Sequence, residues 1–208
     1  MTDAEKKALM QTQATQAQGL DYLRRILLAP VYDVAVETAL TPMTKLSSRL
    51  ENQIFLKRED QQPVHSFKLR GAYNKLANLT EQQCLHGVIA ASAGNHAQGL
   101  ALAAHKLGIK ATIVMPITTP DIKVDNVRRY GAEVRLVGKS FNEAQQASME
   151  YAQSEQKTIV HPFDDSDVIA GEGTVAKATS NRCSVYSCRW WWVVSGYGGV
   201  SKTATTSY

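Results

Sequence analysis

The sequence predicts an α/β fold in which helices cover a parallel sheet. Short apolar runs, typical of buried strands, alternate with segments of about ten to fifteen residues that have helical periodicity. Residues 88–91 are apolar at every position, as expected of a strand covered on both faces. Gly108 and Gly131 follow two of the helical segments and mark their ends. This alternation indicates parallel strands joined by right-handed crossovers.

The elements before the first core strand are shorter and less regular. Residues 3–29 predict a helix ended by Pro30, because apolar side chains recur at helical spacing near its end. The elements expected next are a short helix over residues 31–39, a turn at Thr41–Met43 leading into residues 45–50, a strand over residues 54–57, a helix from Ser66 to about Leu79 and a polar helical cap region over residues 80–83.

The second half of the chain completes the alternation. Ser140 and Glu143 have the spacing of a capping box, and Asp121 is expected to cap a helix of its own. The strands are expected at residues 88–91, 111–115, 133–137 and 158–161. Between them we expect a helix that the Ser92–Gly99 motif opens and that runs to Leu107, and helices at residues 121–130 and 140–156.

Composition indicates a soluble cytoplasmic protein. The 208 residues leave room for one large domain or about one and a half small ones. No apolar run approaches the ~20 residues that a membrane span requires, and the polar N-terminal residues do not resemble a secretion signal. The three cysteines, Cys84, Cys183 and Cys188, fit neither a zinc site nor a disulfide framework, so we expect no metal.

The net charge of +4 does not indicate a nucleic-acid partner. Four basic residues and no acidic ones follow residue 176, which leaves 19 basic against 19 acidic residues in the first 176. The basicity therefore lies wholly in the tail, and we expect neither nucleic-acid nor membrane binding.

The segment from His65 to Tyr73 contains a lysine suited to chemistry. Ser66 can cap a helix, which places Lys68 in the first turn in front of an apolar stripe. The helix dipole disfavours a cation there, and this field with partial burial lowers the pKa of an amine and makes it more nucleophilic. A lone lysine is more often a surface residue, so the interpretation depends on a second motif.

The second motif runs from Ser92 to Gly99. A strand, a short loop of Ser92, Ala93, Gly94, Asn95 and His96, and a helix follow one another. Unpaired N–H groups at a helix N-terminus bind a carboxylate well, and a glycine lets the backbone approach the ligand. Taken alone, the motif is equally well explained as an ordinary strand-to-helix turn. His96 could be a catalytic base, but a histidine just inside a helix is more often structural.

Together the two motifs resemble the threonine dehydratase (threonine ammonia-lyase) family of pyridoxal-phosphate enzymes. The resemblance implies that Lys68 carries the cofactor as a Schiff base and that Phe67 lies against it. It also implies that Asn95 bonds the cofactor ring hydroxyl and that the loop of Ser92, Ala93, Gly94, Asn95 and His96 holds the substrate carboxylate. The resemblance extends from about Tyr22 to about Thr174.

The run from Lys57 to Lys68 resembles the biosynthetic branch of that family. Catabolic dehydratases and serine racemases have Thr-Gly where this chain has Val64-His65. The resemblance implies a fold-type II pyridoxal-phosphate architecture, like that of tryptophan synthase β, and homo-oligomers under allosteric control. The implied reaction is β-elimination of threonine to 2-oxobutanoate and ammonia, in isoleucine biosynthesis, with Lys68 as the base; serine would yield pyruvate.

Asp164, Asp165 and Asp167 form the densest group of carboxylates. They could suggest a metal site, but they precede an apolar helical segment. We therefore expect them to cap that helix.

The tail over residues 177–208 departs from the family pattern. It contains no Leu, Ile, Met, Phe, Asp or Glu, and it holds all three tryptophans, at 190–192. Three TGG codons before a valine codon, read one nucleotide later, spell three glycines. The shifted frame resembles the family's phosphate-binding glycine loop, so we interpret the tail as the product of a frameshift and expect it to be irregular.

We therefore divide the chain into residues 1–176, an incomplete part of the catalytic domain, and residues 177–208, an aberrant tail. Without the glycine loop we expect no activity from the 208-residue chain. Two alternatives stay open. One is a non-catalytic pseudoenzyme or interaction fragment, and the other, within the family, is a serine racemase or catabolic dehydratase.

Overall fold

The computed structural model describes residues 21–178, 185–186, 193–195 and 199–201. Contacts between Cα atoms divide the chain into two units, Pro30–Glu172 and the remainder. The predicted division at residue 176 stays a prediction. No helix in the described ranges is both long enough and apolar enough to cross a membrane.

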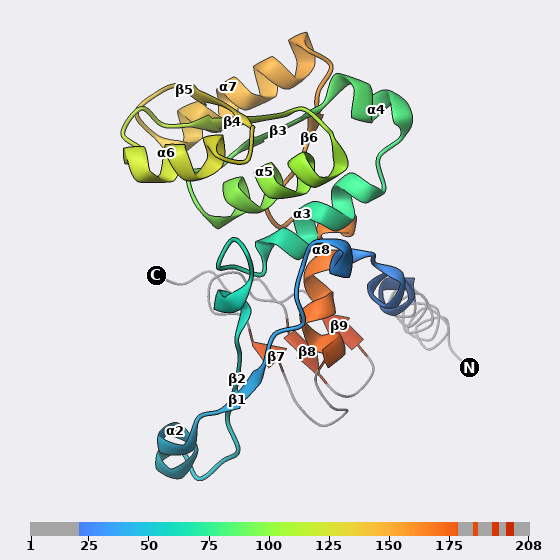
Figure 1. The fold of residues 1–208 in the computed structure, drawn as a ribbon, viewed down its shortest axis with the longest axis vertical. Coiled ribbons are helices and arrows are strands. Elements are labelled where there is room, and N and C mark those ends of the chain that lie inside the picture. Colours follow the sequence, from blue (N-terminus) through green and yellow to red (C-terminus); the bar gives the residue numbers. More distant parts are fainter. Residues whose placement is uncertain (1–20, 179–184, 187–192, 196–198, 202–208) are drawn as a thin grey trace, which may run out of the picture. The chain divides into compact units, whose positions relative to one another are not determined.

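The larger unit is built on a four-stranded parallel sheet with the order β5-β4-β3-β6 (Figure 1). The alternation read from the sequence is confirmed. Val88 pairs with Ala111 on one side and with Thr158 on the other, so β3 lies inside the sheet. The strands are β3 (Val88–Ala91), β4 (Ala111–Met115), β5 (Glu133–Leu136) and β6 (Thr158–Ile159), the last shorter than expected.

Helices cover both faces of this sheet, as the apolar strands require. Ile89 and Val114 pack with Ala144 and Ala152 of α7 on one face. Ala90 and the other alternate positions face the larger core, which α3, α5 and α6 complete. The helices are α3 (Lys68–Ala77), α4 (Glu81–His86), α5 (Asn95–Leu107), α6 (Asp121–Arg128) and α7 (Phe141–Ser154).

The caps agree with the sequence in part. Ser140 Oγ accepts from the Glu143 N–H as expected. In a capping box the Glu143 carboxylate would accept from the Ser140 N–H, but here it accepts from the Lys139 N–H. Asp121 is the first residue of α6 and does not cap it, because Pro120 occupies the N-cap position. The cap region at Thr80 opens α4 with a complete capping box.

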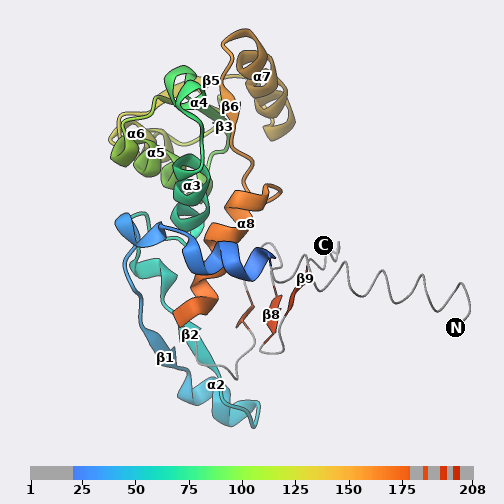
Figure 2. The same ribbon diagram turned by 90° about the vertical axis from the view of Figure 1, so that its right-hand side faces the viewer.

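Residues 30–62 differ most from expectation. They form an arm that extends away from the parallel sheet (Figure 2). The expected helix over residues 31–39 is wrong, because only the 3-10 helix η1 (Val31–Asp33) forms. The expected turn at Thr41–Met43 is also wrong, because Thr41 lies in a strand. The arm contains β1 (Leu40–Pro42), paired antiparallel with β2 (Phe55–Lys57), then α2 (Thr44–Arg49) and the 3-10 helix η2 (Glu59–Gln61).

A side chain explains why residues 34–39 are not helical. Gln62 accepts from the Val36 N–H at 2.9 Å and donates to the Val36 carbonyl at 2.8 Å. Both backbone groups that a helix would use are therefore already paired. The extended segment that results joins η1 to β1.

The smaller unit contributes separate short pieces. Residues 21–28 are helical, which confirms the C-terminal part of the first expected helix, while residues 3–20 lie outside the description. The 3-10 helix η3 (Thr174–Ala178) follows α8 (Ser166–Gly173), which belongs to the larger unit except for Gly173. The tail contains strands β7 (Val185–Tyr186), β8 (Val193–Ser195) and β9 (Gly199–Ser201), paired antiparallel, so an irregular tail is wrong for these residues. Their valines favour extended backbone.

Candidate active site

Lys68 is the first residue of α3. The N-cap residue is Phe67, not Ser66 as expected, yet the Ser66 hydroxyl still accepts from the Lys68 N–H at 3.2 Å. The Lys68 side chain is nearly buried, with 9% exposed, and its Nζ lies 5.2 Å from the centre of the Phe67 ring. The motif therefore places an amine inside the protein and not on its surface.

Two acceptors hold this amine. Lys68 Nζ donates to the Pro162 carbonyl at 2.6 Å and to Glu172 Oε1 at 2.9 Å. Pro162 follows β6 and Glu172 lies in the last turn of α8, so three segments distant in sequence meet at one nitrogen. The sequence predicted the lysine but neither partner.

Glycines explain how α8 comes close enough. A Cβ on Gly171 would lie 2.4 Å from the Arg70 carbonyl oxygen, and one on Gly71 would lie 2.8 Å from Glu172 Cγ. Both distances are shorter than any van der Waals contact permits. Only glycine at these two positions lets α3 and α8 approach and brings the Glu172 carboxyl to the amine.

Glu172 has an unusual environment. Burial raises the pKa of its carboxyl to about 7, even though the Lys68 ammonium acts in the opposite direction. Its Oε2 is buried and has no hydrogen-bond partner in the described structure. At neutral pH this carboxyl can therefore gain or lose a proton at little cost in free energy.

The Ser92–His96 loop follows β3, at the carboxyl edge of the sheet beside the end of β6. Its Ser92 N–H bonds the Val114 carbonyl, and the Ser92 hydroxyl accepts from the Gly94 N–H at 3.3 Å. Asn95 is exposed at the first position of α5, and Ala93 packs against the core. Apart from its chain neighbours, no described residue has an atom within 4 Å of where a Gly94 Cβ would stand. Space for a ligand is therefore open at this helix N-terminus.

His96 is structural in this geometry. It is buried, its Nε2 lies 3.0 Å from the Val160 carbonyl, and its Nδ1 has no partner in the described structure. A carbonyl only accepts, so Nε2 carries the proton. Burial lowers the pKa of His96 to about 4, and the nearby Lys68 ammonium adds to this effect. The ring is therefore neutral at neutral pH.

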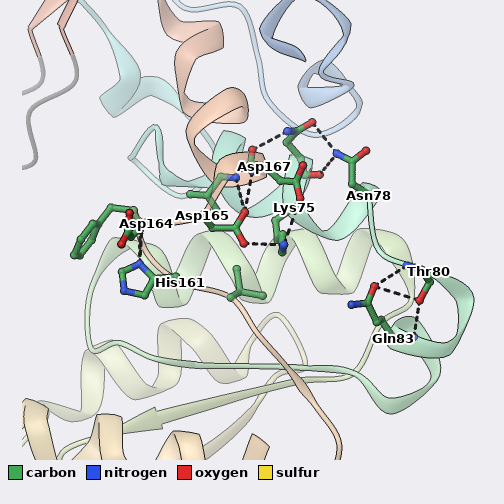
Figure 3. Close-up of polar contacts among 12 residues, drawn as sticks. Lys75, Asn78, Thr80, Gln83, His161, Asp164, Asp165 and Asp167 are labelled. Carbon is green, nitrogen blue, oxygen red and sulfur yellow. Dashed lines mark hydrogen bonds and ion pairs between the residues drawn. The ribbon is translucent and has the colours of Figure 1, made fainter. Parts of the chain in front are cut away.

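The segment after β6 joins the two motifs. The Val160 carbonyl accepts a hydrogen bond from the His96 ring, and the Pro162 carbonyl accepts one from the Lys68 amine. His161 between them accepts from the Asp164 N–H at 2.7 Å, which turns the chain toward α8 (Figure 3). The lysine and the carboxylate loop are thus brought together at the carboxyl ends of β3 and β6, where open α/β sheets bind ligands.

Of the carboxylates expected to cap α8, Asp167 lies within the helix, and Asp165 caps it from the position before the first residue. Its Oδ1 accepts from the Asp167 N–H at 2.8 Å and the Val168 N–H at 3.2 Å, and Lys75 lies 2.7 Å from its other oxygen (Figure 3). Lys75 also lies 3.3 Å from Asp167. Within the described ranges no group of His, Cys, Asp or Glu has metal-binding geometry.

Sequence reasoning missed a second buried ion pair beside the lysine. Arg70 is fully buried and its guanidinium meets the Glu59 carboxylate through two bonds, at 2.8 and 3.0 Å. Thr38 and Gln62 also bond Glu59. This network fixes the arm to α3 directly behind Lys68. The sequence did contain a signal, because Glu59 lies in the run from Lys57 to Lys68 and Arg70 lies in the segment from His65 to Tyr73.

Comparisons with known proteins agree with this arrangement. A family model described as pyridoxal-phosphate dependent enzyme matches residues 31–202, a range that includes part of the tail. L-threonine dehydratase biosynthetic IlvA of Escherichia coli (strain K12) is 59% identical over 159 residues, which are 76% of this chain and 31% of that protein. Threonine dehydratase 1 biosynthetic, chloroplastic, of Solanum lycopersicum is 57% identical over 157 residues, 76% of this chain and 26% of that protein.

Solved structures are similar as well. The processed form of threonine deaminase isoform 2 from Solanum lycopersicum matches with a TM-score of 0.76 and 48% identity over 79% of this chain and 47% of that chain. Maize serine racemase matches with a TM-score of 0.71 and 31% identity over 76% of this chain and 47% of that chain. The chain spans about a third of the length of the curated relatives it matches. Because the family model covers well over half of its residues, the chain belongs to the pyridoxal-phosphate dependent enzyme family.

Proposed function

We propose that this chain is part of the catalytic domain of a biosynthetic threonine dehydratase, which converts threonine to 2-oxobutanoate and ammonia in isoleucine biosynthesis. The observation that carries the proposal is the convergence of the buried Lys68 amine with the Ser92–His96 loop at the carboxyl ends of β3 and β6. The high identity to proteins of that name supports it.

The residues present fit pyridoxal phosphate at its aldehyde and ring. Lys68 supplies a buried primary amine, Phe67 supplies an aromatic surface beside it, and Asn95 lies exposed at the start of α5. When bound, the cofactor supplies an electron sink for charge that develops on the substrate α-carbon. The residues that would hold its phosphate are expected after residue 176 and lie outside the described contacts.

Each residue then has a role. The N–H groups of the Ser92–His96 loop bind the threonine carboxylate at the N-terminus of α5. Lys68 Nζ would remove the proton from the α-carbon and pass it to the β-hydroxyl, which leaves as water. The enamine that remains hydrolyses to 2-oxobutanoate and ammonia. Neutral His96 does not act as a base here, because burial holds its pKa at about 4.

Threonine is favoured over the alternative substrates of related proteins. Solved serine racemases match at 31% and 27% identity, against 48% for the tomato threonine deaminase. Val64-His65 before the lysine motif also differs from the Thr-Gly of racemases and catabolic dehydratases. A non-catalytic role for the chain is the second candidate, favoured by the departure of the tail from the family pattern.

We further propose that residues 177–208 arise from a shifted reading frame and that the chain is located in the cytoplasm, as part of a homo-oligomeric enzyme. Independent sequencing of the DNA for codons 170–208 tests the first point. A single-nucleotide difference that opens the glycine-rich frame supports it. An unchanged DNA sequence would show that the tail does not result from a sequencing error.

A ligand titration tests the function. Pyridoxal phosphate is added to the purified chain and the visible absorbance of the lysine Schiff base is followed, then threonine or D-serine is added. We expect the absorbance in wild type and in Lys106→Ala, an exposed lysine of α5, but not in Lys68→Ala. Threonine should change the spectrum at lower concentration than D-serine. Equal spectra for Lys68→Ala and wild type, or a preference for D-serine, would count against the proposal.

A further inference from the structure

The Lys68 amine has an acid directly beside it. Its Nζ and Glu172 Oε1 are 2.9 Å apart, and only 9% and 4% of the two side chains are exposed. The Pro162 carbonyl accepts a second bond from the same nitrogen. Both acceptors suit an ammonium group, so the geometry is that of a charged lysine paired with a carboxylate.

A lysine in this state cannot react with an aldehyde. Attack on the carbonyl carbon uses the nitrogen lone pair, and in an ammonium group a proton occupies that pair. A group within reach must therefore accept the proton before the bond forms. Any residue that does so is part of the chemistry of this site.

The neighbouring titratable groups leave Glu172 as the acceptor. His96, from α5, has a pKa held at about 4 by burial, and its Nε2 faces the Val160 carbonyl. His161, from the segment after β6, already accepts N–H bonds from Phe163 and Asp164 through Nδ1. Glu172 alone combines direct contact with Nζ and a buried oxygen, Oε2, that has no partner in the described structure.

The position of Glu172 is fixed by backbone packing. Gly71 and Gly171 let α8 lie against α3, and a Cβ at either would clash at 2.8 or 2.4 Å. The backbone of α8 at Glu172 is therefore held close to the first turn of α3, within reach of the Lys68 amine. Its pKa, raised to about 7 by burial, means that proton uptake near neutral pH costs little.

We propose that Glu172 accepts the proton that Lys68 loses when its Nζ forms a C=N bond with an aldehyde. One N–H proton passes from the Lys68 ammonium to the Glu172 carboxylate. The neutral amine adds to the aldehyde carbon, and its two remaining hydrogens leave with the aldehyde oxygen as water. The inference rests on the proposed function, because pyridoxal phosphate supplies the aldehyde.

A count of protons follows from this role. Above about pH 7 the Glu172 carboxylate is ionised and keeps the proton, so bond formation releases about none to the solvent. Below that pH Glu172 is already protonated, and about one proton is released for each bond. In Glu172→Gln the side chain keeps its shape but cannot accept, so about one proton is released above pH 7 as well.

The test measures protons released per C=N bond at pH 7.5 to 8, with pyridoxal phosphate as the probe. Wild type, Glu172→Gln and Glu81→Gln, an exposed carboxylate of α4, are compared by calorimetry in two buffers of different protonation enthalpy. Protons that pyridoxal phosphate itself gains or loses are the same for all three proteins, so they cancel when the proton counts are compared. We expect Glu172→Gln to release about one proton more than the other two. Equal counts would overturn the inference and leave the proposed function standing.

Wild type alone provides a second measurement if Glu172→Gln does not fold. A simple aromatic aldehyde without titratable groups is bound at several pH values. The apparent association constant should be independent of pH above about 7. Below that pH it should fall about tenfold for each unit by which the pH is lowered. A tenfold dependence that continues above pH 7 would overturn the inference. Absence of any C=N bond in wild type would instead overturn the proposed function, and this inference with it.

Discussion

At the scale of single residues, the site depends on charges buried in pairs. Lys68 meets Glu172 and Arg70 meets Glu59, both within the first turn of α3. Removing one member of a buried pair leaves an uncompensated charge, which costs far more than the pair contributes. The Arg70–Glu59 pair is expected to affect stability, and the Lys68–Glu172 pair is expected to affect the chemistry of the amine. Substitutions at one pair or the other can separate these two effects.

Arg70 should affect the stability of the fold and not the reactivity of the Lys68 amine, because its guanidinium pairs with Glu59. Arg70→Ala should lower the free energy of unfolding by about 3–5 kcal/mol, because the Glu59 carboxylate stays buried without its partner. Urea unfolding followed by circular dichroism measures this. The double variant Arg70→Met with Glu59→Gln should recover part of the loss, and a loss below about 1 kcal/mol for Arg70→Ala would contradict the account.

His96 predicts a pH dependence with a definite sign. Its pKa is about 4 in the folded chain, lowered from 6.5, so stability is complete above pH 6.5 and is lost as pH falls toward 4. The full effect is about 3 kcal/mol. The raised pKa of Glu172 acts oppositely, because folding there favours the protonated form between pH 4.5 and 7.

Unfolding at a series of pH values isolates the His96 contribution when wild type is compared with His96→Gln. The nearby charges of Lys68, His161 and Glu172 are the same in both and cancel in the difference. The stability difference should shrink as pH falls from 6.5 to 4. A difference that does not vary with pH would show that His96 is not buried in its neutral form.

At the scale of elements, the site is made by the approach of α3, α5 and α8. Gly171 lies against the Arg70 carbonyl, and Gly99 of α5 would place a Cβ 2.9 Å from the Leu69 backbone nitrogen. Close backbone contact at these glycines, more than any side chain, sets where Lys68 and Glu172 lie. Small residues in helices are therefore as important here as the charged ones.

Gly171→Ala tests this packing. The added methyl would meet backbone at 2.4 Å, so we expect a loss of about 1–3 kcal/mol in unfolding free energy and a weaker Lys68–Glu172 contact. Thermal and urea unfolding measure the loss. Gly94→Ala is the matched control, because its methyl would lie within 4 Å of no described residue beyond its chain neighbours. Its stability should be unchanged within about 0.5 kcal/mol, while threonine binding weakens if the substrate approaches Gly94.

The periodicity of the sequence was enough to predict the sheet, the helices and the two motifs. It could not reveal Glu172, because the bond to Lys68 joins residues 104 apart. The helix expected over residues 31–39 failed for a similar reason, since Gln62 pairs with the backbone of Val36 from 26 residues away. Local patterns predict local structure, and these contacts are set by the tertiary fold.

At the scale of the whole molecule, the arm carries apolar side chains that the described structure leaves exposed. Leu50, Phe55 and Leu56 are each about half exposed, at 57%, 49% and 47%. Exposed apolar clusters of this kind favour association. The matched part of the chain spans only about a third of the relatives, so in a whole protein such a surface can meet further chain.

The purified 208-residue chain should therefore self-associate through the arm. Light scattering should show mass rising with concentration for wild type, and less so for Leu50→Ser with Phe55→Ser. Leu85→Ser, at an even more exposed site on α4, is the control and should behave as wild type. Identical scattering from all three would assign the association to another surface.

The central claim is that Lys68 is the amine that holds the cofactor. Treatment of the chain with pyridoxal phosphate, reduction with borohydride and peptide mass mapping locate the labelled lysine directly. The account predicts label on Lys68 at substoichiometric cofactor, with Lys75 and Lys106 unmodified. Label spread over exposed lysines, or label undiminished in Lys68→Arg, would contradict it.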